Sequence, residues 1–466
     1  MSTIVVGGVL LPTDPGERSS SRRLATALRR GIQDGLLPDG SVLPPSRALA
    51  AELGCSRWLV TEVYGQLVAE GYLVATVGSG TRVRTPAPAA TGARQGGPVR
   101  TPGRPRFDLS PGVADLRAFP RTQWAAAYRR AVLELPTDSL AGQTLSDSIP
   151  ARTVITGYLE RTRQVRETPA QLVMTTGASA AVGWLARLLA TLGHRTVAVE
   201  DPSWPGLREA AARNGLRPVP VGVDEEGLRV EELSGRRLRG TRAVIATPAH
   251  QFPVGVALSP ERRRALVEWA ERVDGVVVED DYDAEFRYDR RPVSSLQGMA
   301  PDRVVLVGSL SKSLGPVVAL GWAVVPQWLL GRMLLDDLAR SVWPGPFTIE
   351  AFAGLVDGGA YERHLRTSRL RLRRRRAALL EAVAELLPGC VPGGVAAGMH
   401  VPLTLPAGTD AAAVVARARE SGVGVADLAR YRVRPASGAG LVLGFGNLRD
   451  GREREAVARL AGALRG

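Results

Sequence analysis

Lysine is nearly absent from this chain of 466 residues. Lysine and arginine together number 60, and Lys312 is the one lysine among them. Arginine can replace lysine at surface sites where a positive charge is all that matters. It cannot serve as an amine nucleophile, because its guanidinium stays protonated, whereas a lysine amine can lose its proton and form a Schiff base. Lys312 is therefore either a candidate functional residue or a surface lysine that happened to persist.

Cysteine and long apolar runs are also scarce. Cys55 and Cys390 are the two cysteines and lie far apart in the sequence, so we expect neither a disulfide framework nor a zinc site. No stretch reaches the length of about 18 apolar residues that a membrane-spanning helix needs. Residues 1–11 lack a basic leader and a cleavage site, so we expect a cytoplasmic protein without a membrane partner.

The remaining composition is that of a folded protein with several units. The chain is 45% hydrophobic and 23% charged, which is typical of globular domains. A length of 466 residues predicts about three units. The formal net charge of +14 indicates an anionic partner without proving one.

Three helices are predicted for residues 19–85. Apolar residues at four-residue spacing within 24–32 indicate the first helix. We expect Ser46 to cap the second helix, which Gly54 ends, and Ser56 to cap the third. Two short helices joined by a turn that contains glycine have the helix-turn-helix spacing.

A β-hairpin follows these helices. The strands predicted at 72–76 and 81–84 are joined by a Gly-rich turn and form a wing. The functional interpretation places the third helix in the major groove of double-stranded DNA, and the alternative is a helical scaffold with incidental arginines. The residues that we expect to contact DNA are Ser46, Arg47, Ser56, Arg57, Thr61, Gly78, Ser79, Gly80 and Thr81.

A second, larger module is predicted from residue 107 onward. Apolar runs that indicate buried strands alternate with helical patterns at 178–192, 206–214 and 260–273. This alternation predicts an α/β fold with a mostly parallel sheet, whose sites lie at the carboxyl ends of the strands. The predicted strands are 196–200, 243–246, 276–279 and 304–307.

Chemically useful residues follow several of these strands. The Gly turn at 175–179 opens a helix and can hold an anion at the free backbone N–H groups. Trp204 can stack on a planar ring or fill the core. Within the segment 279–283, three consecutive carboxylates at 279–281 are too costly to bury without a role. They suggest a magnesium site or a pyridine cofactor, and Lys312, which follows the strand at 304–307, favours the cofactor.

The segment between the two modules differs from both. Residues 86–106 are rich in Pro, Gly, Ala and Arg and are predicted to be a flexible linker. The chain then consists of an N-terminal extension at 1–18, the winged module at 19–85 and the body at 107–466. The arginines within 363–376 are either a nucleic-acid patch or a solvated helix face, and we favour the solvated face.

Both modules resemble known families. The segments 43–50, 53–57, 64–73 and 78–81 look like the winged helix-turn-helix of GntR-type bacterial regulators. The body resembles the fold-type I aminotransferases that use pyridoxal 5'-phosphate, with a large part at about 107–345 and a small α+β part at about 346–466. The combination resembles a MocR-type regulator. The segments that carry the second resemblance are 107–112, 119–121, 247–255, 279–288, 308–316, 362–366, 398–400 and 443–445.

The resemblance implies a role for each candidate residue. Lys312 would hold pyridoxal 5'-phosphate as an internal aldimine, and Asp280 would pair with the pyridine nitrogen. Tyr282 and Gln251 would contact the ring hydroxyl, and Trp204 would stack on the ring. The residues expected around the phosphate are Ala178, Ser179, Ser309 and Ser311.

Two positions depart from the family pattern. Ala319 stands where the family has an arginine that contacts the cofactor phosphate, and Val442 stands where an arginine grips a substrate carboxylate. The loss of one charged hydrogen-bond partner costs about 1.5–3 kcal/mol, so these departures favour a sensor over an efficient transaminase. We therefore expect a homodimeric, DNA-binding regulator that senses a small-molecule effector such as an amino compound. The alternatives are an active aminotransferase with an accessory head and a regulator that has lost the cofactor.

Overall fold

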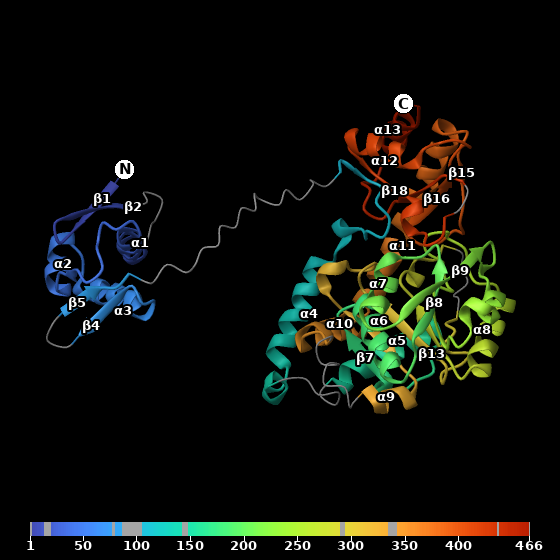
Figure 1. The fold of residues 1–466 in the computed structure, drawn as a ribbon, viewed down its shortest axis with the longest axis horizontal. Helices are drawn as coiled ribbons and strands as arrows, with labels where there is room; N and C mark the ends of the chain where they lie inside the picture. The colour runs from blue at the N-terminus through green and yellow to red at the C-terminus, as the bar shows by residue number, and fades with distance from the viewer. Residues whose placement is uncertain are drawn as a thin grey trace. The chain divides into compact units, whose positions relative to one another are not determined.

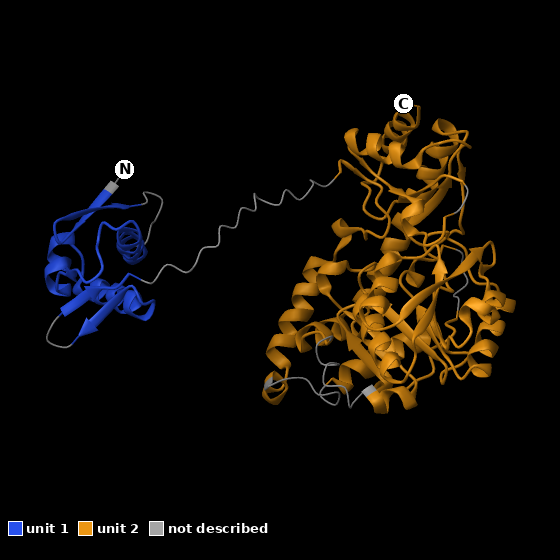
Figure 2. Ribbon diagram, in the orientation of Figure 1, with its two compact units in different colours: residues 1–102 blue, residues 103–466 orange. Residues whose placement is uncertain are grey.

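The computed structural model describes residues 2–13, 20–76, 80–85, 105–141, 148–288, 294–333, 343–435 and 438–465. The chain divides into two compact units, Met1–Pro102 and Gly103–Gly466, which we call the head and the body (Figure 2). Most of the predicted linker, residues 86–104, lies outside the described residues. Among those that are described, no helix is both long and apolar enough to cross a membrane.

Three helices build the core of the head: α1 (Ser20–Gln33), α2 (Ser46–Leu53) and α3 (Arg57–Ala69) (Figure 1). α1 buries Leu24 and Ile32, as the apolar spacing predicts, and they share one cluster with the buried side chains of α2 and α3. The helix-turn-helix order is therefore present.

Two of the three predicted helix ends in the head are confirmed. Gly54 ends α2 in the left-handed conformation with φ 63°, and Ser56 Oγ accepts a hydrogen bond from the Leu59 amide at 3.2 Å to cap α3. The predicted Ser46 cap is wrong. Pro45 occupies the cap position, Ser46 is already helical, and no side chain caps α2.

The predicted wing is a small antiparallel sheet in the order β3 (Val42–Leu43), β5 (Gly80–Val83) and β4 (Leu73–Thr76). The extra strand β3 comes from the segment before α2. Gly78 and Ser79, which we expected at the tip, lie outside the described residues.

Residues 1–18 were expected to be an extension, but part of this segment belongs to the head. β1 (Ser2–Val6) and β2 (Val9–Thr13) form an antiparallel hairpin. Val6 and Leu11 are fully buried in the cluster that also contains the α1 face. The head therefore has a larger core than the helix-turn-helix and wing alone provide.

An eight-stranded sheet forms the centre of the body. β7, β8, β9, β11, β12 and β13 are parallel to one another, β14 runs antiparallel to both of its neighbours, and β10 runs antiparallel to β9. The mostly parallel sheet is thus confirmed. The strand order is β10 (Gly227–Leu228), β9 (Arg217–Asp224), β8 (Thr196–Asp201), β11 (Ala243–Ala246), β12 (Val276–Asp280), β13 (Val304–Ser309), β14 (Gly321–Val324) and β7 (Leu172–Thr175).

Helices cover both faces of this sheet. In β12, Val276 and Val278 pack in one cluster with Leu185, whereas Val277 packs in another with Trp269. Alternate residues of a strand point to opposite faces, so a continuous apolar run is what a sheet covered on both sides requires. The three helices predicted between the strands are α6 (Ala178–Thr191), α7 (Pro205–Arg213) and α8 (Pro260–Arg272).

The rest of the body comprises longer helices and a small α+β part. In that part α12 and α13 accompany a sheet of four strands in the order β15, β16, β19 and β18 (Figure 1). β6 (Phe107–Asp108) pairs in parallel with β17 (Val423–Gly424) and so connects the first residues of the body to the small part. The bounds are α4 (Arg121–Glu134), α5 (Ile149–Arg163), α9 (Gln327–Met333), α10 (Pro346–Asp357), α11 (Ala360–Leu386), β15 (Val391–Pro392), β16 (His400–Thr404), α12 (Ala411–Glu420), β18 (Ala426–Asp427), β19 (Gly440–Gly444) and α13 (Glu453–Arg465).

The arginine run lies on α11. Arg373 and Arg374 are exposed, as a solvated face predicts. Arg375 is different, because it is 4% exposed and pairs with Asp115 at 2.9 Å and Asp450 at 2.5 Å. Part of the run is therefore an internal brace of the body.

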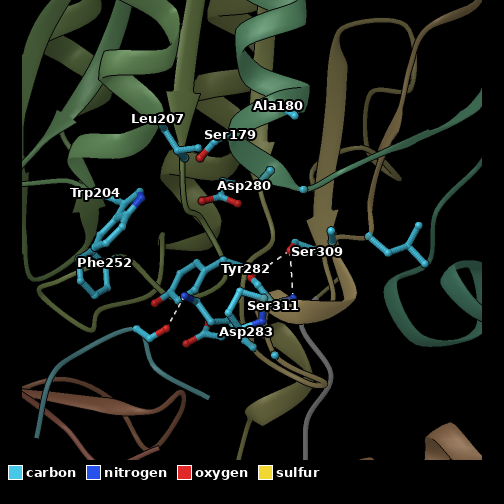
Figure 3. Close-up of a pocket in the computed structure, with 18 of the residues that line it drawn as sticks. Ser179, Ala180, Trp204, Leu207, Phe252, Asp280, Tyr282, Asp283, Ser309 and Ser311 are labelled. Atoms are coloured by element: carbon cyan, nitrogen blue, oxygen red, sulfur yellow. Dashed lines mark hydrogen bonds between the residues drawn. The ribbon is translucent and has the colours of Figure 1, made fainter. Parts of the chain in front are cut away.

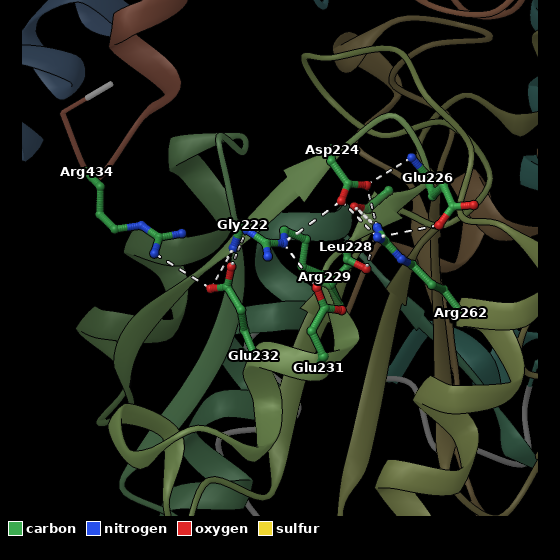
Figure 4. A network of polar contacts seen from close by, with 10 residues as sticks. Gly222, Asp224, Glu226, Leu228, Arg229, Glu231, Glu232, Arg262 and Arg434 are labelled. Atoms are coloured by element: carbon green, nitrogen blue, oxygen red, sulfur yellow. Dashed lines mark hydrogen bonds and ion pairs between the residues drawn. The ribbon is translucent and has the colours of Figure 1, made fainter. Parts of the chain in front are cut away.

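A polar network joins the edge of the large sheet to the small part (Figure 4). Arg262 holds both carboxylate oxygens of Asp224, at 2.5 and 2.8 Å, and the hydrogen bond from Arg262 lowers the pKa of Asp224. Arg434 reaches Glu232 at 3.6 Å and Asp201 at 3.1 Å. These contacts fix the segment that precedes β19 against the ends of β8 and β9.

Candidate functional site

A cavity of about 510 Å³ lies at the carboxyl ends of the parallel strands (Figure 3). Its volume is in the range of small-molecule sites. All of the predicted cofactor residues except Gln251 line it: Ala178, Ser179, Trp204, Asp280, Tyr282, Ser309, Ser311 and Lys312.

Lys312 follows β13 and extends its amine into the cavity. Its Nζ donates a hydrogen bond to the carbonyl oxygen of Gly112 at 2.6 Å. A Cβ at position 112 would lie 3.3 Å from Nζ, and φ there is +80°, so glycine suits this contact. Burial lowers the pKa of Lys312, although Asp283 and Asp280 oppose the shift. A lower pKa favours the neutral amine, which is the nucleophilic form.

Asp280, the last residue of β12, provides the negative side of the cavity. It is 6% exposed, and its Oδ1 has no hydrogen-bond partner among the described residues. Burial raises the pKa of Asp280 to about 8, and Asp281 adds to the shift. A buried carboxylate oxygen without a donor is costly. It fits a ligand that brings its own donor, such as a protonated ring nitrogen.

The neighbouring carboxylates of Asp280 are used elsewhere. Asp281 pairs with the buried Arg163 at 2.6 Å, and Glu279 accepts hydrogen bonds from the backbone amides of Leu296 and Gln297. The three carboxylates therefore do not converge, which argues against the magnesium interpretation and leaves Asp280 for the cavity.

Tyr282 is held by a chain of polar groups behind it. Its hydroxyl lies 3.1 Å from His250 Nδ1, and the same nitrogen lies 2.9 Å from Asp283 Oδ2. The rings of Tyr282 and His250 stack with centroids 6.1 Å apart. The chain fixes the direction of the tyrosine hydroxyl within the cavity.

His250, Asp283 and His400 also form a buried group whose ligand-type atoms lie within 4.8 Å of one another. His400 Nε2 is 3.2 Å from the carbonyl oxygen of Pro253, and burial lowers the pKa of His400 well below its usual value. Because His250 Nδ1 and His400 Nε2 already have hydrogen-bond partners, we interpret the group as support for Tyr282.

Gln251 does not line the cavity, contrary to the expected contact with a ring hydroxyl. It is 1% exposed. Its Nε2 donates to the carbonyl oxygens of Pro202 and Phe252 at 2.8 Å, and to Glu200 at 3.1 Å. Gln251 thus holds the turn after β11 together, and the preceding residue, His250, is the one that reaches Tyr282.

The part of the cavity at the start of α6 can accept an anion. α6 begins at Ala178 after Gly177, and neither a side-chain cap nor an acidic residue occupies its first turn. Backbone N–H groups at such a helix start are free to bind phosphate. Ser179 lies in this first turn, and Ser311 donates its amide to Ser309 Oγ at 3.1 Å from the side of β13. The four predicted phosphate residues are thus brought together.

Trp204 lies on the side of the cavity shared with Phe252 (Figure 3). It is 42% exposed. Its ring stacks on Tyr431 with centroids 6.3 Å apart and meets the edge of Phe252 at 5.7 Å. The indole therefore forms an apolar wall against which a planar ligand can lie.

The two departures from the family pattern have different surroundings. Ala319 lines the cavity, is exposed, and has the left-handed φ of 48°. Val442 is fully buried in an apolar cluster with Phe252, Ala426 and Tyr431. A longer side chain has room at position 319, whereas position 442 is part of the core.

Several lining residues were not predicted from the sequence. Gly112, Asp283, Met399 and His400 line the cavity, and His250 supports it. All five residues fall in segments quoted for the resemblance, within 107–112, 247–255, 279–288 and 398–400. The sequence signal for these residues is therefore their place in those segments. It does not show which of two neighbouring residues faces the cavity, because the local turn decides that.

In the head, most predicted DNA contacts are accessible. Arg47, Ser56, Arg57, Thr61 and Gly80 are exposed, and Ser46 and Thr81 are half-buried. Thr61 Oγ1 donates to the carbonyl oxygen of Arg57 at 2.9 Å, so its hydroxyl oxygen still accepts. Trp58 was not predicted, yet it is 73% exposed on the same helix.

Known protein families match both the head and the body. The family model "Bacterial regulatory proteins, gntR family" matches residues 20–83, and "Aminotransferase class I and II" matches residues 122–438. The kynurenine aminotransferase of Pyrococcus horikoshii has the same fold as the body. It covers 77% of this chain and 90% of its own, with 24% identity and a TM-score of 0.69.

Two curated relatives share more of the sequence. The pyridoxine biosynthesis regulator PdxR of Corynebacterium glutamicum is 32% identical over 462 residues, which are 98% of each chain. The probable rhizopine catabolism regulatory protein MocR of Rhizobium meliloti is 32% identical over 75% of this chain and 74% of its own. The chain therefore belongs to the MocR-type regulators of the GntR family, in which a helix-turn-helix head is joined to an aminotransferase class I and II domain.

Proposed function

We propose that the chain is a DNA-binding transcriptional regulator whose body binds pyridoxal 5'-phosphate through Lys312 and senses a small-molecule effector. The observation that carries the proposal is the placement of the Lys312 amine and the unpartnered Asp280 oxygen in one cavity, in a chain with a helix-turn-helix head. The similarity to a regulator of pyridoxine biosynthesis supports the choice of cofactor.

Each residue of the cavity suits one part of this cofactor. Pyridoxal 5'-phosphate supplies an aldehyde for an amine and an electron-withdrawing ring. Asp280 accepts a hydrogen bond from the protonated ring nitrogen, and Tyr282 donates to the ring hydroxyl. The start of α6 binds the phosphate together with Ser309 and Ser311. Binding is weak for this class of site, because Ala319 offers no charge to the phosphate.

The visible absorbance of the purified protein tests the cofactor. Protein with added pyridoxal 5'-phosphate should gain an absorbance band that survives dialysis and is lost in Lys312→Ala. Lys312→Arg is the matched control, because it keeps the positive charge but removes the nucleophile. A colourless wild-type protein that takes up no cofactor would favour a regulator that has lost it.

A gel shift with DNA from upstream of its own gene tests the regulator. Binding should be sequence-selective and should weaken as salt rises, because phosphate contacts release counterions. Arg57→Ala should weaken binding to all sequences. The absence of salt-sensitive, selective binding would contradict the proposal.

The competing function is an active aminotransferase with an accessory head. Its support is the retained set of Lys312, Asp280 and Tyr282 around one cavity. Incubation with amino acids and the cofactor, followed by a keto acid, separates the two functions. Steady turnover would favour the enzyme, whereas ligand-induced spectral change without turnover favours the sensor.

We also propose that the regulator is a homodimer. α4 buries one residue, Ala131, and exposes Tyr128, Val132 and Leu133 at 37%, 48% and 71%. A group of exposed apolar side chains marks an interaction surface. A second copy is the occupant that suits a helix-turn-helix regulator, since two heads read two half-sites.

A further inference from the structure

Trp58 is an unusual residue to find on the surface of the head. It is 73% exposed, whereas the other exposed tryptophans, Trp204 and Trp328, are 42% and 40% exposed. It lies in the first turn of α3, immediately after the Ser56 cap and Arg57. A large apolar side chain that remains in water at such a position indicates a binding partner.

Trp58 is part of one exposed stripe along α3. Thr61, Glu62 and Gly65 follow it at the spacings of three, four and seven residues that share a helix face, and all of them are exposed. The opposite face, which includes Val63, is buried in the core of the head. The stripe is therefore the outer surface of the second helix of the helix-turn-helix.

Gly65 shows that the head does not cover this stripe. A Cβ at position 65 would meet nothing within 4 Å, and φ there is not positive. Glycine disfavours a helix interior relative to alanine, and neither packing nor backbone conformation in the head explains it. A residue without a side chain leaves room for an approaching surface.

The charge and position of the first turn of α3, where the stripe begins, suit duplex DNA. No acidic residue lies in the first turn of α3, and Arg57 adds a positive charge beside Trp58. In helix-turn-helix proteins the N-terminal residues of the second helix contact base edges in the major groove. Only thymine presents a methyl group there, and apolar side chains recognise it.

We propose that Trp58 determines sequence specificity by packing its indole against the 5-methyl group of a thymine in the operator half-site. The proposal rests on the proposed DNA-binding function and names one base that the protein recognises. Thr61 on the same stripe contacts a neighbouring base or phosphate, and Glu62 accepts a hydrogen bond from the amino group of a neighbouring cytosine.

The experiment uses the full-length protein and a site selected from random duplex DNA. Each thymine of the selected half-site is replaced in turn by uracil, which lacks the methyl group. One replacement should weaken wild-type binding by roughly threefold to tenfold, the effect of burying one methyl group. The same replacement should leave the affinity of Trp58→Ala unchanged. Trp58→Ala should bind the thymine site roughly tenfold to a hundredfold more weakly than the wild type.

Controls separate this inference from the function on which it rests. Trp328→Ala removes an exposed tryptophan from the body and should bind DNA like the wild type. Thermal unfolding should show Trp58→Ala to be folded, because its side chain contributes little to the core. If the wild type selects no sequence, the DNA-binding function fails. If it selects a site that Trp58→Ala binds equally well, or if uracil weakens both proteins equally, the role of Trp58 is wrong.

Discussion

Asp280 keeps a carboxyl group in a place where water cannot solvate its charge. Burial raises the pKa of Asp280 to about 8 and that of Glu200 to about 7. Both groups bind protons more tightly in the folded body than in the unfolded chain. Their contribution to the free energy of unfolding is therefore complete below their unfolded pKa values and is lost as pH rises through 7 to 8.

This sign gives a prediction for the cofactor-free protein. The free energy of unfolding of the body should fall as pH is raised from about 5 to about 9, and Asp280→Asn should make the fall shallower. Urea unfolding at a series of pH values measures both. An equally steep fall in Asp280→Asn would show that Asp280 is already ionised in the folded body at neutral pH.

Position 319 offers the opposite kind of test, a gain of binding. Ala319→Arg should place a charge beside the proposed phosphate site and tighten the binding of pyridoxal 5'-phosphate by about 10- to 150-fold, or 1.5–3 kcal/mol. Titration of the visible absorbance measures the affinity. Ala319→Gln has a long side chain without the charge and should gain little. Equal gains in both variants would assign the effect to contact area.

Single residues of the site were predictable when chemistry alone selects them. The lone lysine identified Lys312, whereas the buried strand end identified only a group of carboxylates, from which the family resemblance selected Asp280. We could not predict that His250, and not Gln251, contacts Tyr282, because the geometry of the turn after β11 decides which of the two neighbours reaches it. Asp283 was missed for the same reason.

At the level of elements, α3 contains a glycine that does not stabilise the head. Gly65→Ala should raise the free energy of unfolding of the head by about 0.5–1 kcal/mol, because alanine favours the helix and its Cβ meets open space. Gly54→Ala is the matched control. It also meets open space, but its φ of 63° disfavours a side chain, so it should destabilise. Chemical unfolding followed by circular dichroism measures both, and a destabilised Gly65→Ala would contradict the prediction.

The N-terminal hairpin provides a second pair of neighbouring residues. Leu11 is fully buried against the helices, whereas Leu10 is 64% exposed. Leu11→Ala should destabilise the head by about 2–4 kcal/mol through cavity formation. Leu10→Ala should change its stability by less than about 0.5 kcal/mol. Similar values for the two variants would mean that the hairpin is not part of the folded head.

Elements with strong local signals were predictable, and those that depend on packing were not. The parallel strands appear as continuous apolar runs, and Gly54 and Ser56 delimit the helices of the head. The hairpin of β1 and β2 has a two-glycine turn at Gly7 and Gly8, both with positive φ. Its apolar residues are too few to indicate burial without the α1 face on which they pack.

For the whole molecule, the exposed face of α4 determines the expected assembly. Leu133→Arg should convert the proposed dimer into a monomer, because it places a charge in an apolar contact. Light scattering coupled to gel filtration measures the mass. Glu134→Gln, at a neighbouring position where the carboxylate makes an exposed ion pair with Arg130 at 3.8 Å, is the control and should stay dimeric. A monomeric wild type would contradict the proposal.

The division of the chain into two modules was also predictable, because each module has its own series of motifs along the sequence. The location of the cavity at the strand ends was predictable. Its chemistry was indicated by the few charged residues that are costly to bury without a function. Its walls were less accessible to sequence reasoning. Met399 and His400 come from the small part of the body, and only the folded chain brings them to the ends of β12 and β13.

The amine of Lys312 lies in the cavity beside the carbonyl group of Gly112. Because the chain has no other lysine, covalent modification of this amine can be measured by protease digestion. A protease that cuts after lysine would divide the unfolded chain into two fragments, residues 1–312 and 313–466. Reduction of a covalent link between Lys312 and its cofactor would block this cut. If the proposed link forms, the fraction of uncut chain on a gel reports directly how much of the regulator carries pyridoxal 5'-phosphate, in the test tube or in cell extracts.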